Sequence, residues 1–132
     1  MNVFVDTSAL LAVLDAQDGN HPKAAKTWER LVSGNDALIS SNYILAETIA
    51  LIQHRLGMEA VREFQENVVP MLTVEWIDEP AHHAGVMGVM TAGRKKLSLV
   101  DCASFNVMRQ MGIRSAFSFD RHFKQQGFEC IP

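Results

Sequence analysis

The chain has 132 residues, of which 48% are hydrophobic and 20% are charged, and its formal net charge is −3. This size and composition predict one globular domain over residues 1–132, with enough apolar side chains for a full core. No uninterrupted apolar stretch approaches the roughly 20 residues that cross a bilayer, and the first residues lack the features of a signal peptide, so we expect no membrane partner. Cys102 and Cys130 form no CxxC motif, which favours a protein without disulfides in the reducing cytoplasm.

Charge is distributed unevenly along the chain. Residues 1–80 contain 5 Lys or Arg and 12 Asp or Glu, whereas residues 81–132 contain 7 and 3. The acidic total argues against a protein that holds DNA by bulk charge. The basic C-terminal part can still attract phosphate, so a nucleic-acid partner stays open.

Short apolar runs alternate with helical patterns along the whole chain. In order, we expect a strand at 2–5, a helix at 9–16, a helix at 22–32, a strand at 37–39, a helix at 42–55, a helix at 58–68, a strand at 72–76, a helix at 79–93, a helix at 98–111, a strand at 114–117, a helical turn at 120–125 and a strand at 128–130. Met87 and Met90 are interpreted as core residues. This alternation predicts an α/β fold with a mainly parallel central sheet of about five short strands, flanked by helices.

Three aspartates stand at expected element boundaries. Asp6 follows the first strand, Asp101 stands three residues after Ser98 in a capping-box pattern, and Asp120 follows the fourth strand. Each can accept hydrogen bonds at a helix N-terminus, so a capping role explains each one by itself. The positive end of the helix dipole keeps such a carboxylate ionised, which is the state that a hard cation requires. Capping and metal binding are therefore compatible.

Glu47 differs because it lies inside a predicted helix, where no cap is needed. Ile44 and Leu51 share its helix face, and no Lys or Arg stands three or four residues away. Burying an unpaired carboxylate lowers the stability of a fold by an amount on the order of several kcal/mol. Glu47 therefore needs a cation, a tertiary salt bridge or an exposed edge position. This residue is the strongest single indication of a metal site.

The four acids are expected to converge at the carboxyl edge of the sheet, where ligands bind in α/β folds. Clustered carboxylates repel one another unless a cation lies between them. Oxygen ligands favour Mg²⁺ or Mn²⁺, and no grouping of histidine and cysteine is typical of a zinc site.

Four stretches, VFVDTSAL, ILAETIA, LSLVDCASF and FSFDRHF, resemble in order and approximate spacing the motif series of PIN-domain ribonucleases. Among these, the nearest resemblance is to the VapC-type toxins of bacterial toxin–antitoxin systems. The resemblance carries the family's four acidic metal ligands onto Asp6, Glu47, Asp101 and Asp120. It also carries a supporting hydroxyl onto Thr7 or Ser8. His122 follows Asp120 but is not needed as a general acid beside metal ions, so we leave it outside the predicted catalytic set.

The resemblance implies a Mg²⁺- or Mn²⁺-dependent endoribonuclease that cleaves single-stranded or structured RNA as the toxin of a toxin–antitoxin pair. Bound ions would lower the pKa of a water molecule, orient it towards a phosphodiester and neutralise charge on the phosphate. Asp6 and Asp101 are the strongest candidates for direct ligands. Two alternatives stay open: a PIN-like module that binds RNA or protein with weak catalysis, and a housekeeping RNA-processing nuclease.

Basic residues near the predicted site are candidates for contacts with phosphate, although charged runs usually form solvated faces. These candidates are Arg94, Lys95, Lys96 and Arg121. The resemblance further implies a homodimer and a small antitoxin partner. The amphipathic helices between residues 41 and 68 would either receive that partner or belong to the core.

Overall fold

Five parallel strands form the central sheet of the computed structural model, which describes residues 1–132. The strands are β1 (Asn2–Val5), β2 (Ala37–Ser41), β3 (Thr73–Glu75), β4 (Ser115–Phe117) and β5 (Glu129–Ile131). Their order across the sheet is β3-β2-β1-β4-β5, and every neighbouring pair is parallel. The predicted α/β fold is confirmed.

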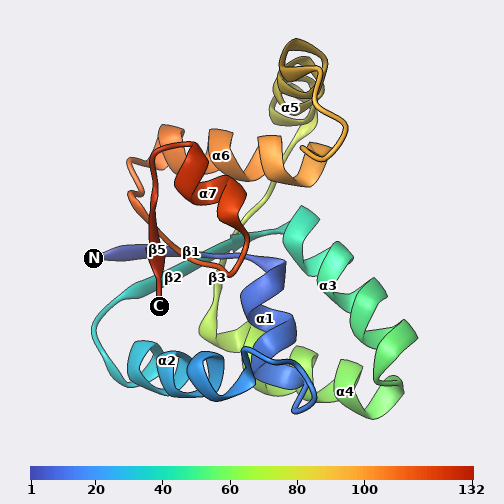
Figure 1. Ribbon diagram of the computed structural model, residues 1–132, viewed down its shortest axis with the longest axis vertical. Helices are drawn as coiled ribbons and strands as arrows, with labels where there is room; N and C mark the ends of the chain where they lie inside the picture. Colours follow the sequence, from blue (N-terminus) through green and yellow to red (C-terminus); the bar gives the residue numbers. More distant parts are fainter.

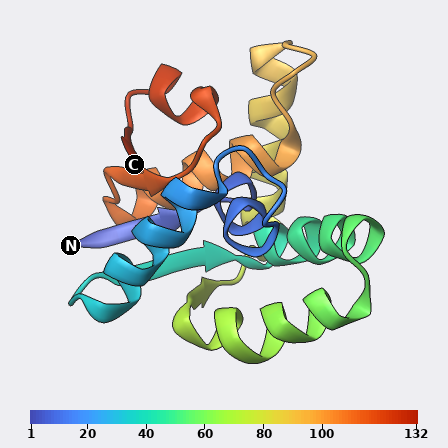
Figure 2. The same ribbon diagram turned by 60° about the horizontal axis from the view of Figure 1, so that its bottom comes forward.

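Helices cover both faces of this sheet (Figures 1 and 2). They are α1 (Thr7–Leu14), α2 (His21–Ser33), α3 (Asn42–Arg55), α4 (Met58–Glu63), α5 (Glu79–Ala92), α6 (Leu99–Met111) and α7 (Arg121–Gln125). After α4 the chain continues as a π-helical turn, η1 (Phe64–Val68), and a 3-10 turn, η2 (Val69–Met71). Helices α1 to α4 lie on one side of the sheet, and α5 to α7 lie on the other.

Strand order reverses between β1 and β4. From β1 the sheet grows through β2 to β3 in one direction and through β4 to β5 in the other. Such a switch point leaves a crevice at the carboxyl ends of the two central strands. The backbone N–H of Asp6 still donates to the carbonyl of Phe117 at 3.1 Å, so the chain segments that follow β1 and β4 start side by side.

Three buried phenylalanines hold α6 and α7 against β1. The rings of Phe105 on α6 and Phe123 on α7 pack edge to face, with centroids 5.1 Å apart, and Phe123 also packs 6.2 Å from Phe4 on β1. Edge-to-face pairs of this kind add about 0.5–1.5 kcal/mol beyond the burial of their area. This packing fixes the start of α7 relative to α6, which is where the functional side chains lie.

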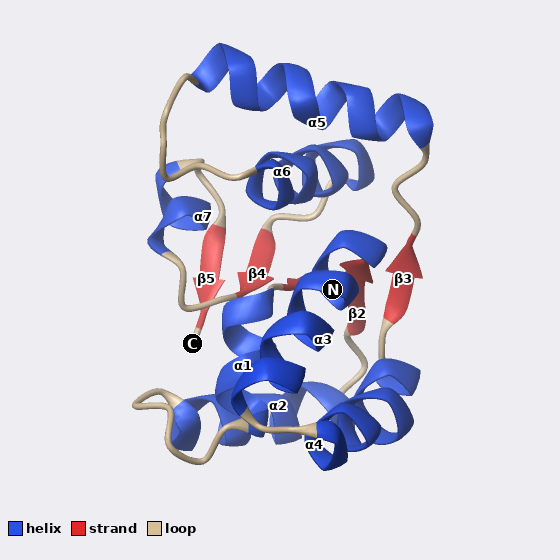
Figure 3. Cartoon of the chain, turned by 90° about the vertical axis from the view of Figure 1, so that its right-hand side faces the viewer, coloured by secondary structure: helices blue, strands red, loops and turns tan.

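Helix α5 forms an outer layer that packs on α6 (Figure 3). Its contact face carries glycines: a Cβ atom at Gly85 would lie 3.1 Å from Leu99 Cδ1, and one at Gly88 would lie 3.4 Å from Cys102 Cβ. The other side of α5 has no protein layer over it, and Met87 and Met90 are 58% and 63% exposed. The prediction that these methionines fill the core is wrong, because glycines occupy the packed side of the helix.

Two negative expectations concern disulfides and membranes. Cys102 and Cys130 are both free, and Cys102 is buried. None of the helices combines the length and the apolar character that crossing a bilayer requires.

Candidate metal centre

Asp6 occupies the carboxyl end of β1 and begins α1. It is only 5% exposed, and its Oδ2 accepts hydrogen bonds from the Ser8 N–H at 3.3 Å and the Ser8 hydroxyl at 2.7 Å. The Ser118 hydroxyl donates to the same oxygen at 3.0 Å. Asp6 Oδ1 accepts no hydrogen bond within the chain. The predicted helix cap is confirmed, and it engages only one of the two carboxylate oxygens.

The two serines tie Asp6 to the segment after β4. The Ser8 hydroxyl accepts from the Phe119 N–H at 2.9 Å, and the Ser118 hydroxyl accepts from the Asp120 N–H at 3.0 Å. Each hydroxyl therefore receives a backbone proton and donates its own proton to Asp6. Sequence reasoning missed Ser118, although a hydroxyl that directly follows a strand, two residues before a candidate ligand, is a signal of this role.

Burial raises the pKa of Asp6 from 3.8 to about 6, the nearby Asp120 carboxylate contributes to the rise, and the hydrogen bonds from Ser8 and Ser118 oppose it. Desolvation disfavours the charged form of any carboxyl group. A divalent cation at Asp6 would offset the cost of burying the ionised carboxylate, because its positive charge attracts the carboxylate in place of the lost water.

Asp101 lies in the first turn of α6. Its Oδ2 accepts from the Ser98 N–H at 3.1 Å, and its own N–H donates to the Ser98 hydroxyl at 3.1 Å. This is the capping box that the sequence predicts. Its side chain is 14% exposed, and Oδ1 accepts no hydrogen bond within the chain.

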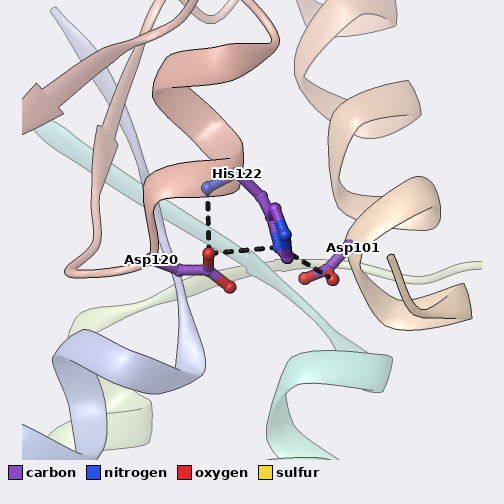
Figure 4. Close-up of side chains that lie close together, drawn as sticks. All are labelled: Asp101, Asp120 and His122. Atoms are coloured by element: carbon purple, nitrogen blue, oxygen red, sulfur yellow. Dashed lines mark hydrogen bonds and ion pairs between the residues drawn. The ribbon is translucent and has the colours of Figure 1, made fainter. Parts of the chain in front are cut away.

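Asp120 begins α7 and faces Asp101 across the side chain of His122 (Figure 4). Its Oδ1 accepts from the His122 N–H at 2.9 Å. The imidazole Nδ1 lies 3.2 Å from this oxygen and 3.7 Å from Asp101 Oδ2. One potential ligand atom from each of the three residues lies within 4.8 Å of the others, a spacing at which they could hold one metal ion.

The three aspartates share one arrangement. In each, one oxygen accepts the hydrogen bonds that organise a helix start, and the other accepts none within the chain. The hydrogen bonds to the first oxygen fix the direction of the carboxylate, and both oxygens keep lone pairs for a cation or for water. Carboxylate oxygens are the ligands that Mg²⁺ and Mn²⁺ take in proteins, so the donor set fits such an ion.

Glu47 lies outside the cluster of Asp101, Asp120 and His122, as Asp6 does. It is half-buried on α3 and forms no ion pair within the chain. The adjacent Thr48 is fully buried, and its hydroxyl donates to the Thr7 hydroxyl at 3.1 Å, which fastens α3 to the start of α1 beside Asp6. The structure supplies no salt bridge for Glu47, so its role as a ligand stays a prediction.

The two candidates for a supporting hydroxyl have different partners. Ser8 donates to the Asp6 carboxylate, whereas Thr7 bonds to Thr48 and joins two helices. Ser8, together with Ser118, is therefore the group that orients Asp6. Holding a ligand in one direction in this way typically changes metal affinity 10–100-fold.

The basic residues predicted to contact phosphate form no ion pairs with the acids of the centre. Arg94, Lys95 and Lys96 are exposed in the connector before α6, and Arg121 is exposed at the start of α7. Beside Asp120 a hollow of about 210 Å³ is lined by Ser118, Phe119, Asp120, Arg121, Lys124, Cys130 and Pro132. Contacts of these cations with phosphate stay a prediction.

Residues 3–129 match the PIN domain family. The chain is 32% identical over 127 residues to the 23S rRNA-specific endonuclease VapC20 of Mycobacterium tuberculosis, a match that covers 96% of this chain and 95% of that protein. The crystal structure of M. tuberculosis VapC20, described as a sarcin-ricin loop cleaving toxin, superposes with a TM-score of 0.87, 31% identity and coverage of 98% and 99%. FitAcB of Neisseria gonorrhoeae superposes at a TM-score of 0.70 with 15% identity over 100% of this chain and 97% of that one, which shows a shared fold.

The chain belongs to the PIN domain family, and the resemblance to VapC-type toxin ribonucleases is confirmed. The likeness covers nearly the whole length of both sequences.

Proposed function

We propose that this protein is a divalent-metal-dependent endoribonuclease, the toxin component of a VapC-type toxin–antitoxin pair. The observation that carries this proposal is the set of aspartates around the switch point between β1 and β4, each with one oxygen engaged in a helix start and one available to a cation. Asp6, Asp101 and Asp120 would hold Mg²⁺ or Mn²⁺, and Glu47 on α3 would contribute directly or through water.

A divalent ion bound there supplies Lewis acidity: it lowers the pKa of water and neutralises charge that develops on a phosphate. The protein itself provides the arrangement. Ser8 and Ser118 keep the Asp6 carboxylate in one direction, and the capping box does the same for Asp101. Preorganised groups cost no rearrangement during the reaction, which is the main way proteins stabilise charged transition states.

The substrate class follows from the relative that matches over nearly the whole chain. M. tuberculosis VapC20 is a 23S rRNA-specific endonuclease, described as cleaving the sarcin-ricin loop. We therefore propose structured ribosomal RNA as the first substrate of this protein. The exposed cations Arg94, Lys95, Lys96 and Arg121 would contact the RNA backbone, which is the sequence-independent part of such binding.

The same relationship suggests the partners and the location. We propose a cytoplasmic homodimer that a small antitoxin protein inhibits. Light scattering on the purified protein measures its molar mass and so tests the dimer. A monomeric mass at micromolar concentration would contradict it. Co-purification with the product of an adjacent reading frame, and loss of RNA cleavage in that complex, test the antitoxin.

The direct test is cleavage of intact ribosomes and of a 23S rRNA fragment with Mg²⁺ or Mn²⁺, read by primer extension. Asp6→Asn is expected to lower the rate at least about 1,000-fold, equivalent to about 4 kcal/mol of transition-state stabilisation. Asp15→Asn is the matched control, because it removes a carboxylate from the opposite end of α1, where Asp15 accepts from the Gln17 N–H, and should keep wild-type activity.

Two results would contradict the proposal. One is wild-type cleavage that persists after exhaustive chelation, and the other is an unimpaired Asp6→Asn enzyme. Metal binding without cleavage of any RNA would favour the alternative of a PIN-like binding module. If the protein cleaves other RNAs but leaves 23S rRNA uncut, only the proposed substrate is wrong.

A further inference from the structure

The imidazole of His122 lies between two of the candidate ligands, Asp101 and Asp120. Its Nδ1 atom is fully buried and makes no hydrogen bond. Asp120 Oδ1 lies only 3.2 Å from it and Asp101 Oδ2 only 3.7 Å from it. Buried polar atoms in folded proteins are nearly always satisfied, so this nitrogen calls for an explanation.

A proton on Nδ1 explains only part of the arrangement: a charged ring attracts both carboxylates as an ion pair, but its N–H still makes no hydrogen bond. At 3.2 Å the Asp120 oxygen is near enough to accept a hydrogen bond, so the absence of one means that it lies well off the N–H direction. A neutral ring with a bare Nδ1 would instead point a lone pair at two carboxylates, which is repulsive. Neither state of the ring gives Nδ1 a hydrogen bond.

A cation shared by the three residues removes this conflict. When an octahedral ion forms bonds of about 2.1 Å, two neighbouring ligand atoms lie about 3.0 Å apart. Their lone pairs point at the ion, so they make no hydrogen bond with each other. The separations of 3.2 and 3.7 Å lie between this value of about 3.0 Å and the roughly 4.2 Å that separates opposite ligands of such an ion. The capping oxygens keep lone pairs for such an ion, because a carboxylate oxygen accepts more than one interaction.

The fold holds His122 in this position. Its backbone N–H is bonded to Asp120, its side chain is 13% exposed, and the next residue, Phe123, is packed against Phe105 of α6. The ring therefore faces the start of α6, where Asp101 lies (Figure 4). No flexible loop has to close to bring the three groups together.

We propose that His122 binds, through Nδ1, the divalent ion held by Asp101 and Asp120, and that this nitrogen makes the centre select Mn²⁺ over Mg²⁺. The inference rests on the proposed metal centre and names its fifth candidate ligand. Mg²⁺ favours all-oxygen surroundings, whereas imidazole raises affinity for first-row transition metals.

The test uses the full-length protein loaded with Mn²⁺ and pulsed electron paramagnetic resonance. Wild type is expected to show coupling of Mn²⁺ to a directly bound ¹⁴N nucleus, and labelling with ¹⁵N-histidine should replace this signal by that of ¹⁵N. His122→Gln should remove the coupling. His54→Gln, which removes an exposed histidine from α3, is the matched control and should keep it.

Metal titration provides a second measurement. In His122→Gln the affinity for Mn²⁺ should fall at least about tenfold, while the affinity for Mg²⁺, measured by competition, should change less than about threefold. Circular dichroism establishes that the variant is folded. The wild-type spectrum requires no variant, so misfolding of His122→Gln leaves the proposal testable.

Wild-type protein that binds Mn²⁺ without nitrogen coupling would overturn the inference, as would equal losses of Mn²⁺ and Mg²⁺ affinity in a folded His122→Gln. These failures are distinct from failure of the proposed function. RNA cleavage without nitrogen coupling would support the proposed ribonuclease and contradict the role of His122 as a metal ligand. Nitrogen coupling without cleavage would support His122 as a ligand and contradict the proposed ribonuclease.

Discussion

The aspartates at the switch point and Glu47 on α3 illustrate two ways of placing an acid. Asp6, Asp101 and Asp120 each begin a helix, and hydrogen bonds to nearby N–H groups fix one oxygen of each. Glu47 has no such bond, and only the packing of its helix, through Thr48 on Thr7, positions it. The first arrangement exists without any ion, whereas the second leaves a half-buried carboxylate without an ion pair in the chain.

Of the substitutions that test this difference, Asp6→Asn is expected to have the largest effect, on the free energy of unfolding of the metal-free protein. Burial raises the pKa of Asp6 from 3.8 to about 6, so above pH 6 the folded protein carries an unfavourable charge. Removing it should increase the free energy of unfolding by up to about 3 kcal/mol at pH 7.5. Below pH 3.8 the carboxyl group is protonated in both folded and unfolded states, so the gain should grow between pH 4 and 6.

Urea denaturation of metal-free protein across this pH range measures the effect. Asp15→Asn serves again as the control and should show no such pH-dependent gain. A loss of stability in Asp6→Asn at pH 7.5 would mean that the helix cap outweighs the cost of the buried charge.

Ser118→Ala tests whether tertiary hydrogen bonds orient Asp6. The variant removes a donor to the carboxylate and an acceptor for the Asp120 N–H. Affinity for Mg²⁺ should fall about 10–100-fold by calorimetry. Ser104→Ala, which removes a buried hydroxyl bonded to the Val100 carbonyl on α6, should bind Mg²⁺ like wild type. Equal affinities in the two variants would limit Ser118 to a structural role.

Glu47→Gln gives the smallest expected effect and sharpens the contrast with Asp6. Because Glu47 has no partner in the chain, its loss should change the free energy of unfolding without metal by less than about 0.5 kcal/mol. Affinity for Mn²⁺ should still decrease about tenfold, or about 1.4 kcal/mol. Glu59→Gln on the exposed face of α4 is the control. A large loss of stability with unchanged metal binding would show that Glu47 is structural.

Most of the secondary structure could be predicted because its signals are local. The strand at 2–5, the helix start at Asp6 and the capping box of Ser98 and Asp101 all form between residues close in the chain. Helix propensity, caps and apolar runs act over a few residues, so a single sequence contains them. The parallel sheet followed from the alternation of these elements.

Side-chain partners across the fold could not be predicted in the same way. Ser118 reaches Asp6 across 112 positions of the chain, and Thr48 reaches Thr7 across 41. A helical pattern also does not tell which side faces a neighbour, and on α5 the glycines rather than the methionines face α6.

The sequence by itself determined the order of strands and helices, the caps and the candidate acids, because each depends on neighbouring residues. Only the tertiary structure decided that Ser8 rather than Thr7 holds Asp6, and that His122 lies between Asp101 and Asp120. The physical reason is packing. The contact of Phe105 with Phe123 sets the approach of α7 to α6, and that approach brings Asp101, Asp120 and His122 close enough to share a cation.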